Sequence, residues 1–176
     1  GQTVEVRLPD DEFEARLNLL GRHNASNALA AASVGWACGC SPEEIRAGLQ
    51  RVEAQPGRLQ VRAGARGSTL IDDTYNANPT SLKAAMRALA ARPGRKALVL
   101  GDMAELGTRA EEFHTEAGRE ARQAGIELLF TCGPLAGLAA EAFGEEGHRF
   151  DSPEDLIKAA RTLLSPGLTV LIKGSR

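Results

Sequence analysis

The chain has 176 residues, of which 43% are hydrophobic and 25% charged, a composition typical of a globular protein that can bury a core. Its 21 basic and 23 acidic residues give no excess of positive charge, so we expect neither nucleic acid nor an anionic membrane as a partner. No apolar run approaches the roughly 20 residues of a transmembrane helix, and the first residues lack the pattern of a signal peptide. Three cysteines, an odd number, argue against a disulfide framework and favour a reducing compartment such as the cytoplasm.

The first 54 residues predict two strands and two helices. Residues 3–8 and 15–20 alternate apolar with polar side chains, which indicates an antiparallel pair of half-buried strands. Residues 25–37 are rich in alanine and predict a helix. Residues 41–50 begin with Ser-Pro-Glu-Glu, the pattern of a capped helix start. This is too little sheet for an independent domain, so we interpret the segment as the end of a larger one.

After residue 55, strands alternate with amphipathic helices. The predicted strands are 59–63, 68–73, 96–102, 126–131, 148–150 and 168–172, and the predicted helices are 80–91, 108–124, 134–143 and 152–164. Continuous apolar strands separated by helices favour a mostly parallel sheet covered on both faces. With right-handed crossovers, this predicts an α/β, Rossmann-like domain.

Polar residues stand at the predicted carboxyl ends of these strands. They are Asp72 and Asp73, Asp102, Thr131, and Lys173 with Ser175. Because parallel strands end at the same edge of a sheet, and ligands bind there in open α/β folds, we expect a site at this edge. The loop Tyr75–Pro79 adds Tyr and Asn side chains, although a solvated strand end followed by a helix cap is the simpler alternative.

Several isolated features have two interpretations. The chain has neither the Gly-x-x-x-x-Gly-Lys-[Ser/Thr] nor the Gly-x-Gly-x-x-Gly pattern of phosphate-binding loops. Arg58, next to Pro-Gly, is either a solvated linker charge or a phosphate contact. The segment Gly101–Gly107 is either a tight turn with a helix cap or part of the site. Cys38-Gly39-Cys40 could suggest a metal or redox pair, but without a second cysteine pair or a nearby histidine we expect structural or incidental cysteines. We expect a structural role for His114 and a surface position for His148.

Five segments together carry a resemblance to a known family. They are Gly21-Arg22-His23-Asn24-x-x-Asn27-Ala28-x-Ala30-Ala31, Gly57-Arg58-Leu59, Asp72-Asp73-Thr74-Tyr75-Asn76-Ala77-Asn78-Pro79, Gly101-Asp102-Met103-x-Glu105-Leu106-Gly107 and Lys173-Gly174-Ser175-Arg176. In this order they resemble the C-terminal portion of a Mur ligase, over nearly all residues from 21 onward. The Asp-Asp-x-Tyr-Asn-Ala-Asn-Pro and Gly-Asp-Met-x-Glu-Leu-Gly patterns resemble the member that adds D-Ala-D-Ala, whereas the His-Asn helix start is shared more widely.

The resemblance implies a three-domain cytoplasmic ligase of peptidoglycan synthesis, and with it a role in cell-wall biogenesis, cell shape and cell division. Residues 1–54 would be the C-terminal end of the central ATP-binding domain, and 55–176 most of the Rossmann-like C-terminal domain. ATP would phosphorylate the terminal carboxylate of UDP-N-acetylmuramoyl-tripeptide, and the amine of D-Ala-D-Ala would then displace phosphate. Mg²⁺ would bridge the ATP phosphates. We expect the full-length enzyme to be a monomer.

The resemblance also implies nucleotide contacts. The helix start near the adenine would contribute His23, Asn24 and Asn27. Arg58 matches the hinge arginine that reaches the nucleotide phosphates. Asp73 matches the carboxylate at the end of the first parallel strand, where the ribose and the hinge meet. The loop residues that face the nucleotide when the domains close would be Tyr75, Asn76 and Asn78.

The resemblance also implies a segment that faces the reacting groups of the substrates. It matches the family's loop opposite the incoming dipeptide and the reactive phosphate, and its candidate catalytic residues are Lys173, Ser175 and Arg176. No residue of this chain is a candidate metal ligand by the resemblance, since the phosphate loop, the magnesium ligands and the UDP-sugar domain have no counterpart in these 176 residues. We therefore expect this chain not to ligate by itself, because catalysis needs both walls of the cleft.

Two other functions fit part of the pattern. Asp73, Asp102, Thr131 and Lys173 at strand ends also fit a receiver-type phosphoacceptor domain. Too few residues separate Asp73 from Asp102, however, to fit a further strand and helix between the two strands that end there. Phosphorylation of Asp102 by a small phosphodonor would support that alternative. Another amide ligase of the same superfamily, of the folate polyglutamate or cyanophycin type, is the second alternative. Activity with D-Ala-D-Ala would exclude it.

Overall fold

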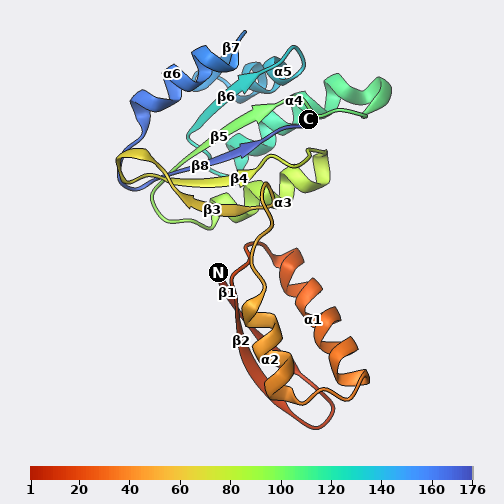
Figure 1. The fold of residues 1–176 in the computed structure, drawn as a ribbon. Coiled ribbons are helices and arrows are strands. Elements are labelled where there is room, and N and C mark those ends of the chain that lie inside the picture. The colour runs from red at the N-terminus through yellow and green to blue at the C-terminus, as the bar shows by residue number, and fades with distance from the viewer. Residues whose placement is uncertain (176) are drawn as a thin grey trace. The chain divides into compact units, whose positions relative to one another are not determined.

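The computed structural model describes residues 1–175 and divides into two compact units, Gly1–Gln55 and a second that begins at Pro56 (Figure 1). The role predicted for Arg176 lies outside the described residues. In the described part of the chain, no helix is both long enough and apolar enough to cross a membrane.

The sheet of the first unit is a single antiparallel hairpin. It consists of β1 (Gln2–Arg7) and β2 (Glu12–Leu17). The apolar partners across it are Val4 with Ala15 and Val6 with Phe13. Because side chains alternate along a strand, these residues share one face, and that face is available to the helices of the unit.

The second strand begins earlier than the predicted residue 15. The turn closes with a 2.8 Å hydrogen bond from the N–H of Leu8 to the carbonyl oxygen of Asp11. Pairing with β1 therefore starts at Glu12, and residues 18–20, predicted to be strand, lie beyond the ladder. The alternation of apolar and polar residues identifies the strand, whereas the turn determines the residue at which pairing begins.

Two helices cover the apolar face of this hairpin, α1 (Arg22–Ala37) and α2 (Pro42–Arg51). The Ser41 hydroxyl accepts a hydrogen bond from the Glu44 N–H at 3.3 Å, and the Glu44 carboxylate accepts one from the Ser41 N–H at 2.8 Å. This is the predicted capping box. The small core comprises Val6, Ala15, Leu17, Ala28, Ala32, Ile45 and Leu49. A two-stranded sheet needs such helix packing to be stable.

The second unit contains a six-stranded sheet in the order β3-β4-β8-β5-β6-β7. Its strands are β3 (Gln60–Ala63), β4 (Thr69–Asp73), β5 (Arg95–Gly101), β6 (Leu128–Cys132), β7 (Gly147–Phe150) and β8 (Leu168–Lys173). All neighbours are parallel except β3, which pairs antiparallel with β4 at the edge. The last strand thus lies in the middle of the sheet, between the strands that end at Asp73 and Gly101.

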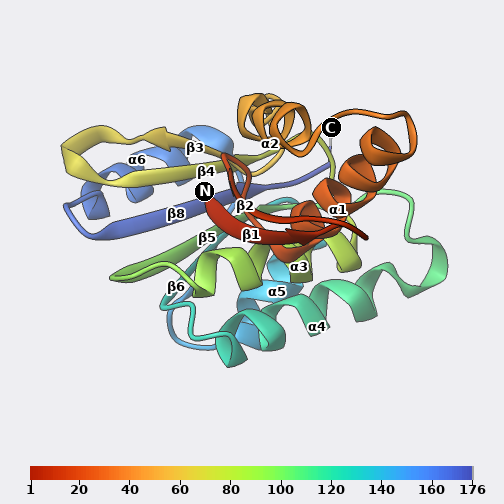
Figure 2. The same ribbon diagram turned by 90° about the horizontal axis from the view of Figure 1, so that it is seen from below.

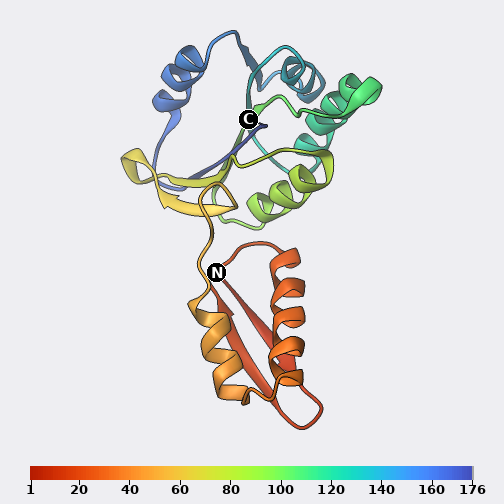
Figure 3. The same cartoon turned by 45° about the vertical axis from the view of Figure 1, so that its right-hand side comes forward.

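Helices lie on both faces of this sheet (Figures 2 and 3). One face carries α3 (Pro79–Ala90), α4 (Ala110–Gln123) and α5 (Ala136–Phe143), and the other carries α6 (Pro153–Leu163). Short 3-10 turns occupy Ala65–Gly67 and Gly107–Arg109. The predicted α/β architecture, a mostly parallel sheet covered on both faces, is confirmed.

Two glycines allow the central strands to approach closely where they end. A Cβ atom on Gly174, just after β8, would lie 3.2 Å from the Cα of Gly101 at the end of β5. Such a distance is tighter than ordinary van der Waals contact, so a side chain would push the strand ends apart. The glycines therefore keep the loops after β5 and β8 adjacent, at the edge where polar residues gather.

Candidate functional site

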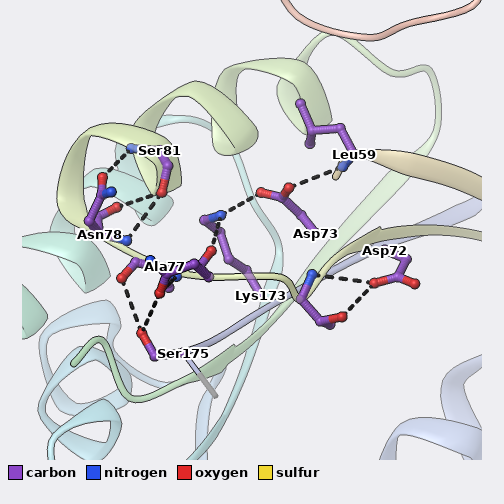
Figure 4. A network of polar contacts seen from close by, with 10 residues as sticks. Leu59, Asp72, Asp73, Ala77, Asn78, Ser81, Lys173 and Ser175 are labelled. Atoms are coloured by element: carbon purple, nitrogen blue, oxygen red, sulfur yellow. Dashed lines mark hydrogen bonds and ion pairs between the residues drawn. The ribbon is translucent and has the colours of Figure 1, made fainter. Parts of the chain in front are cut away.

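Asp73 and Lys173 form the centre of the site, at the carboxyl ends of β4 and β8. The two residues are register partners in the parallel ladder. Lys173 Nζ lies 2.5 Å from Asp73 Oδ2, and the exposed fractions of the two residues are 3% and 9% (Figure 4). The sequence predicts that both strands end at the same edge of a parallel sheet, and the observed pairing of β4 with β8 brings these two ends together.

This ion pair also binds the backbone on both sides. The Leu59 N–H donates to Asp73 Oδ1 at 3.0 Å, and Lys173 Nζ donates to the carbonyl oxygen of Asn76 at 2.9 Å. A buried ion pair is tolerated when further hydrogen bonds satisfy its remaining atoms, and these contacts do so. The pair therefore fixes the entry into the unit at Leu59 and the loop that follows β4.

Lys173 was predicted to face the incoming dipeptide and the reactive phosphate. In the structure its ammonium is enclosed and bound to Asp73 and Asn76. What Lys173 does here is hold the loop after β4 in place. Direct contact with a substrate stays a prediction.

Arg58 and Tyr75 form an exposed cationic and aromatic surface. The guanidinium carbon of Arg58 lies 4.1 Å from the centroid of the Tyr75 ring, and Tyr75 is 49% exposed. The N–H of Tyr75 donates to the carbonyl oxygen of Gly57 at 3.0 Å. Gly57 has a φ of +71°, and a Cβ atom there would lie 3.0 Å from the Tyr75 backbone nitrogen. Only glycine permits this approach without strain.

The two asparagines of the loop have local structural roles. The Oδ1 atom of Asn76 accepts from the Ala77 N–H at 2.8 Å. Asn78 is the N-cap of α3, and its Oδ1 accepts from the Ser81 N–H at 2.8 Å, while the Ser81 hydroxyl accepts from the Asn78 N–H at 3.1 Å. The simpler interpretation, a turn followed by a helix cap, therefore describes Asn78 correctly. A nucleotide contact from either amide stays a prediction.

Ser175 connects three loops at the sheet edge. Its N–H donates to the carbonyl oxygen of Asp102 at 2.9 Å, and its hydroxyl accepts from the Ala104 N–H at 3.0 Å. The same hydroxyl lies 3.1 Å from the Ala77 carbonyl oxygen and 3.2 Å from Asn76 Oδ1, and it can donate its single proton to one of them. Ser175 therefore ties the loop after β5 to the loop after β4.

The third predicted group lies in the first unit, at the start of α1. His23 and Asn27 are exposed, and Asn24 is partly buried. The Asn24 Nδ2 donates to the carbonyl oxygen of Leu20 at 2.8 Å, and Asn27 Nδ2 donates to Asn24 Oδ1 at 3.3 Å. The two asparagines are thus linked to each other, as their spacing on one helical turn predicts. Their approach to an adenine stays a prediction.

The sequence did not reveal several groups that hold this site. One of them is the Leu59 N–H, which donates to Asp73. Leu59 has a φ of +50°, a conformation that L-residues rarely adopt and that the sequence gives no reason to expect. The backbone N–H groups of Met103 and Ala104 also could not be identified from the sequence, because every residue except proline carries the same donor. His114 was expected to be structural, and it is buried.

Among residues 1–175, no group of three or more His, Cys, Asp or Glu side chains is arranged to hold a metal ion. Asp102, the acidic residue after β5, uses Oδ1 to accept from the N–H groups of Leu135 at 3.1 Å and Ala136 at 2.7 Å. This carboxylate anchors the start of α5 to the loop after β5. The site therefore offers cationic, aromatic and hydroxyl groups at its edge, while its acidic groups bind the protein itself.

Comparison with models of protein families gives a match that covers nearly all of the second unit. The family model described as "Mur ligase, glutamate ligase domain" matches residues 57–176. The UDP-N-acetylmuramoyl-tripeptide–D-alanyl-D-alanine ligase of Escherichia coli strain K12 is 39% identical over 178 aligned positions, covering 100% of this chain and 39% of the relative. The chain thus spans well under half the length of this curated relative.

Solved structures of Mur ligases are also similar to this chain. A MurF structure from Acinetobacter baumannii has a TM-score of 0.86 and 33% identity, covering 99% of this chain and 39% of that one. A MurF ligase from Thermotoga maritima, solved in complex with ADP, has a TM-score of 0.79 and 28% identity, covering 99% of this chain and 43% of that one. Both matches include the two compact units of the chain.

Proposed function

The chain belongs to the Mur ligase family, and on this basis we propose that it forms the nucleotide-facing part of a ligase that uses ATP to add D-alanyl-D-alanine to UDP-N-acetylmuramoyl-tripeptide. The reaction belongs to peptidoglycan synthesis. The three cysteines, all of them free, support a reducing compartment, the cytoplasm, as the place of action. Residues 1–54 would be the C-terminal end of the ATP-binding domain, and residues 55–176 would be most of the Rossmann-like C-terminal domain.

The observation that carries this proposal is the exposed stack of Arg58 on Tyr75, held at a sheet edge by a buried ion pair. A planar guanidinium binds phosphate oxygens in a bidentate manner, and it keeps its charge at every physiological pH. An aromatic ring beside it can hold the guanidinium in position or contact a base. Because the loop is anchored before any ligand arrives, little conformational freedom is lost on binding.

In the proposed reaction, a carboxylate oxygen of the tripeptide attacks the γ-phosphorus of ATP, the bond to the bridging oxygen breaks, and ADP leaves. The amine of D-Ala-D-Ala then attacks the acyl carbon and releases a proton to solvent, an amide bond forms, and inorganic phosphate leaves with the electrons of the broken C–O bond. Arg58 would bind the negative charge of the nucleotide phosphates. Ser175 would present its loop to the acyl phosphate. Mg²⁺, when bound, offsets phosphate charge, and its ligands would be residues other than those described.

The two alternative functions have less support. In a receiver-type domain, the carboxylate after β5 must be open to a phosphodonor, whereas Asp102 Oδ1 already accepts two backbone N–H groups. A ligase of the folate polyglutamate type would use a glutamate amine in place of D-Ala-D-Ala. The Asp-Asp-x-Tyr-Asn-Ala-Asn-Pro and Gly-Asp-Met-x-Glu-Leu-Gly segments support the D-Ala-D-Ala enzyme.

The first test is a titration of this chain with ADP and ATP, with and without Mg²⁺, followed by amide-resolved NMR. We expect shifts at residues 23–27, at Arg58 and at residues 73–78. Shifts at Asp102 and Lys173 with acetyl phosphate, and none at residues 73–78 with ATP, would contradict the proposal. The second test measures phosphate release by the natural protein that carries this chain, with the tripeptide substrate and either D-Ala-D-Ala or L-glutamate. Release must depend on D-Ala-D-Ala.

A further inference from the structure

We infer that His114 is a positioning residue of this site, because its neutral imidazole anchors the loop after β5 on which Ser175 rests. His114 lies on α4, and its side chain is fully buried. Its effect on the reaction rests on the proposed function. Its effect on the loop does not, and the two are tested separately.

Both ring nitrogens of His114 have backbone partners. Nε2 accepts from the Met103 N–H at 2.9 Å, and Nδ1 lies 2.7 Å from the carbonyl oxygen of Ala110. A backbone N–H can only donate and a carbonyl oxygen can only accept, so Nε2 must carry the lone pair and Nδ1 the proton. The partners thus select one neutral tautomer, because an imidazolium would place a second donor against the Met103 N–H.

The anchored loop reaches the site one residue later. Ala104, next to Met103, donates its N–H to the Ser175 hydroxyl at 3.0 Å. That hydroxyl also contacts the loop after β4, at the Ala77 carbonyl oxygen and at Asn76 Oδ1. A continuous set of hydrogen bonds therefore runs from the imidazole through two adjacent residues to Ser175 and the loop after β4.

The conformation of this loop needs an anchor of this kind. Glu105 has a φ of +61°, in the left-handed region that L-residues other than Asn, Asp and His seldom adopt. Such a backbone persists only when surrounding contacts hold it. Met103 itself is 1% exposed, so its side chain also belongs to the buried part of the unit. Without the acceptor at Nε2, the buried Met103 N–H would lose its hydrogen bond to His114.

The first experiment measures the ring nitrogens and backbone amides of this chain by NMR. In the unchanged chain, we expect Nε2 to resonate as a non-protonated nitrogen coupled to the Met103 N–H. His114→Leu removes the acceptor and should accelerate amide exchange at Met103 and Ala104 by about tenfold or more. His114→Gln retains an acceptor and should restore most of the protection. His148→Leu, the same change at a partly exposed ring stacked on Phe130, is the matched control and should leave these amides unchanged.

The second experiment measures kcat and KM in the natural protein that carries this chain. For His114→Leu we expect kcat to fall about tenfold or more while KM for ATP changes less than twofold, with partial recovery in His114→Gln. Loosened amides with unchanged kcat would overturn the positioning role. A ligase that is inactive without any substitution would instead overturn the proposed function. If His114→Leu does not fold, the tautomer of the unchanged chain still decides, since a protonated Nε2 contradicts the anchor.

Discussion

Lys173 and Asp73 are separated by 100 positions in the sequence, and their side chains form a 2.5 Å ion pair in the interior of the second unit. The pair exists because β8, the last strand, inserts between β4 and β5 in the sheet. Through the Leu59 N–H and the Asn76 carbonyl oxygen, it holds the segments that carry Arg58 and Tyr75. The exposed part of the site is therefore positioned by a buried one.

Removal of the ammonium should destabilise the second unit. Lys173→Met leaves the Asp73 carboxylate buried without its cation, and we expect a loss of roughly 3–5 kcal/mol in the free energy of unfolding. Lys158→Met, at an exposed pair with Asp155, is the control, and should change it by less than about 1 kcal/mol. Denaturation followed by circular dichroism measures both, while the chain's one tryptophan, Trp36, reports the first unit separately. Equal effects of the two substitutions would contradict the role of the buried pair.

The guanidinium of Arg58 should matter through its shape as well as its charge. Arg58→Ala should weaken ADP binding by about tenfold or more, and Arg58→Lys should recover only part of the affinity, because lysine cannot bind phosphate in a bidentate manner or stack flat on a ring. Arg161→Lys, at an exposed position of α6, is the matched control. Calorimetric titration of the chain with ADP measures the difference. Full affinity in Arg58→Lys would mean that charge alone acts there.

Gly57 should tolerate no side chain, for two separable reasons. Gly57→Ala places a methyl group on a residue with a φ of +71° and 3.0 Å from the Tyr75 nitrogen. Gly125→Ala imposes a similar φ of +74° with nothing within 4 Å, so it measures the backbone strain alone, about 1–2 kcal/mol. We expect Gly57→Ala to exceed this loss and also to weaken ADP binding. If both substitutions had the same effect in denaturation and titration, the close approach to Tyr75 would contribute neither to stability nor to ADP binding.

Asn78 has a capping role that can be separated from a nucleotide contact. Asn78→Ala should cost about 1 kcal/mol of stability, since it removes the acceptor for the Ser81 N–H. Asn78→Ser keeps an N-cap and should stay within about 0.5 kcal/mol of the unchanged chain. If the amide also faces the nucleotide, as we propose, Asn78→Ser will still weaken ADP binding. Unchanged affinity would assign Asn78 to capping alone.

The capping box of α2 should make the first unit sensitive to acid. The hydrogen bond from the Ser41 backbone N–H, and after it the one with the Ser41 side chain, lowers the pKa of Glu44 below its ordinary value. A lowered pKa in the folded state means that the carboxylate stabilises above the ordinary Glu pKa and loses this effect as the pH falls through the lowered value. Glu44→Gln should therefore reduce the unfolding midpoint at neutral pH but not in strong acid. Glu43→Gln, at the same helix end, is the control, and Trp36 fluorescence measures the midpoint.

Most of the fold could be predicted from the sequence because its signals are local. Alternation along strands, the i, i+3, i+4 spacing in helices and the Ser-Pro-Glu-Glu start each depend on neighbouring residues alone. The start of the second strand is an exception. The strand expected at 15–20 begins at Glu12, since the Leu8–Asp11 turn set the register and alternation alone does not specify where pairing starts.

The sequence by itself also determined which strand ends would carry polar residues, and therefore at which edge of the sheet a site would lie. Only the tertiary structure decided which of those residues face solvent. Asp73 and Lys173 are buried on each other, Asp102 binds the start of α5, and Arg58 with Tyr75 remains exposed. The physical reason is that a charged side chain is enclosed only where a partner from a distant segment satisfies it. Such partners, among them the backbone donors of Leu59 and Met103, leave no trace in the order of residues.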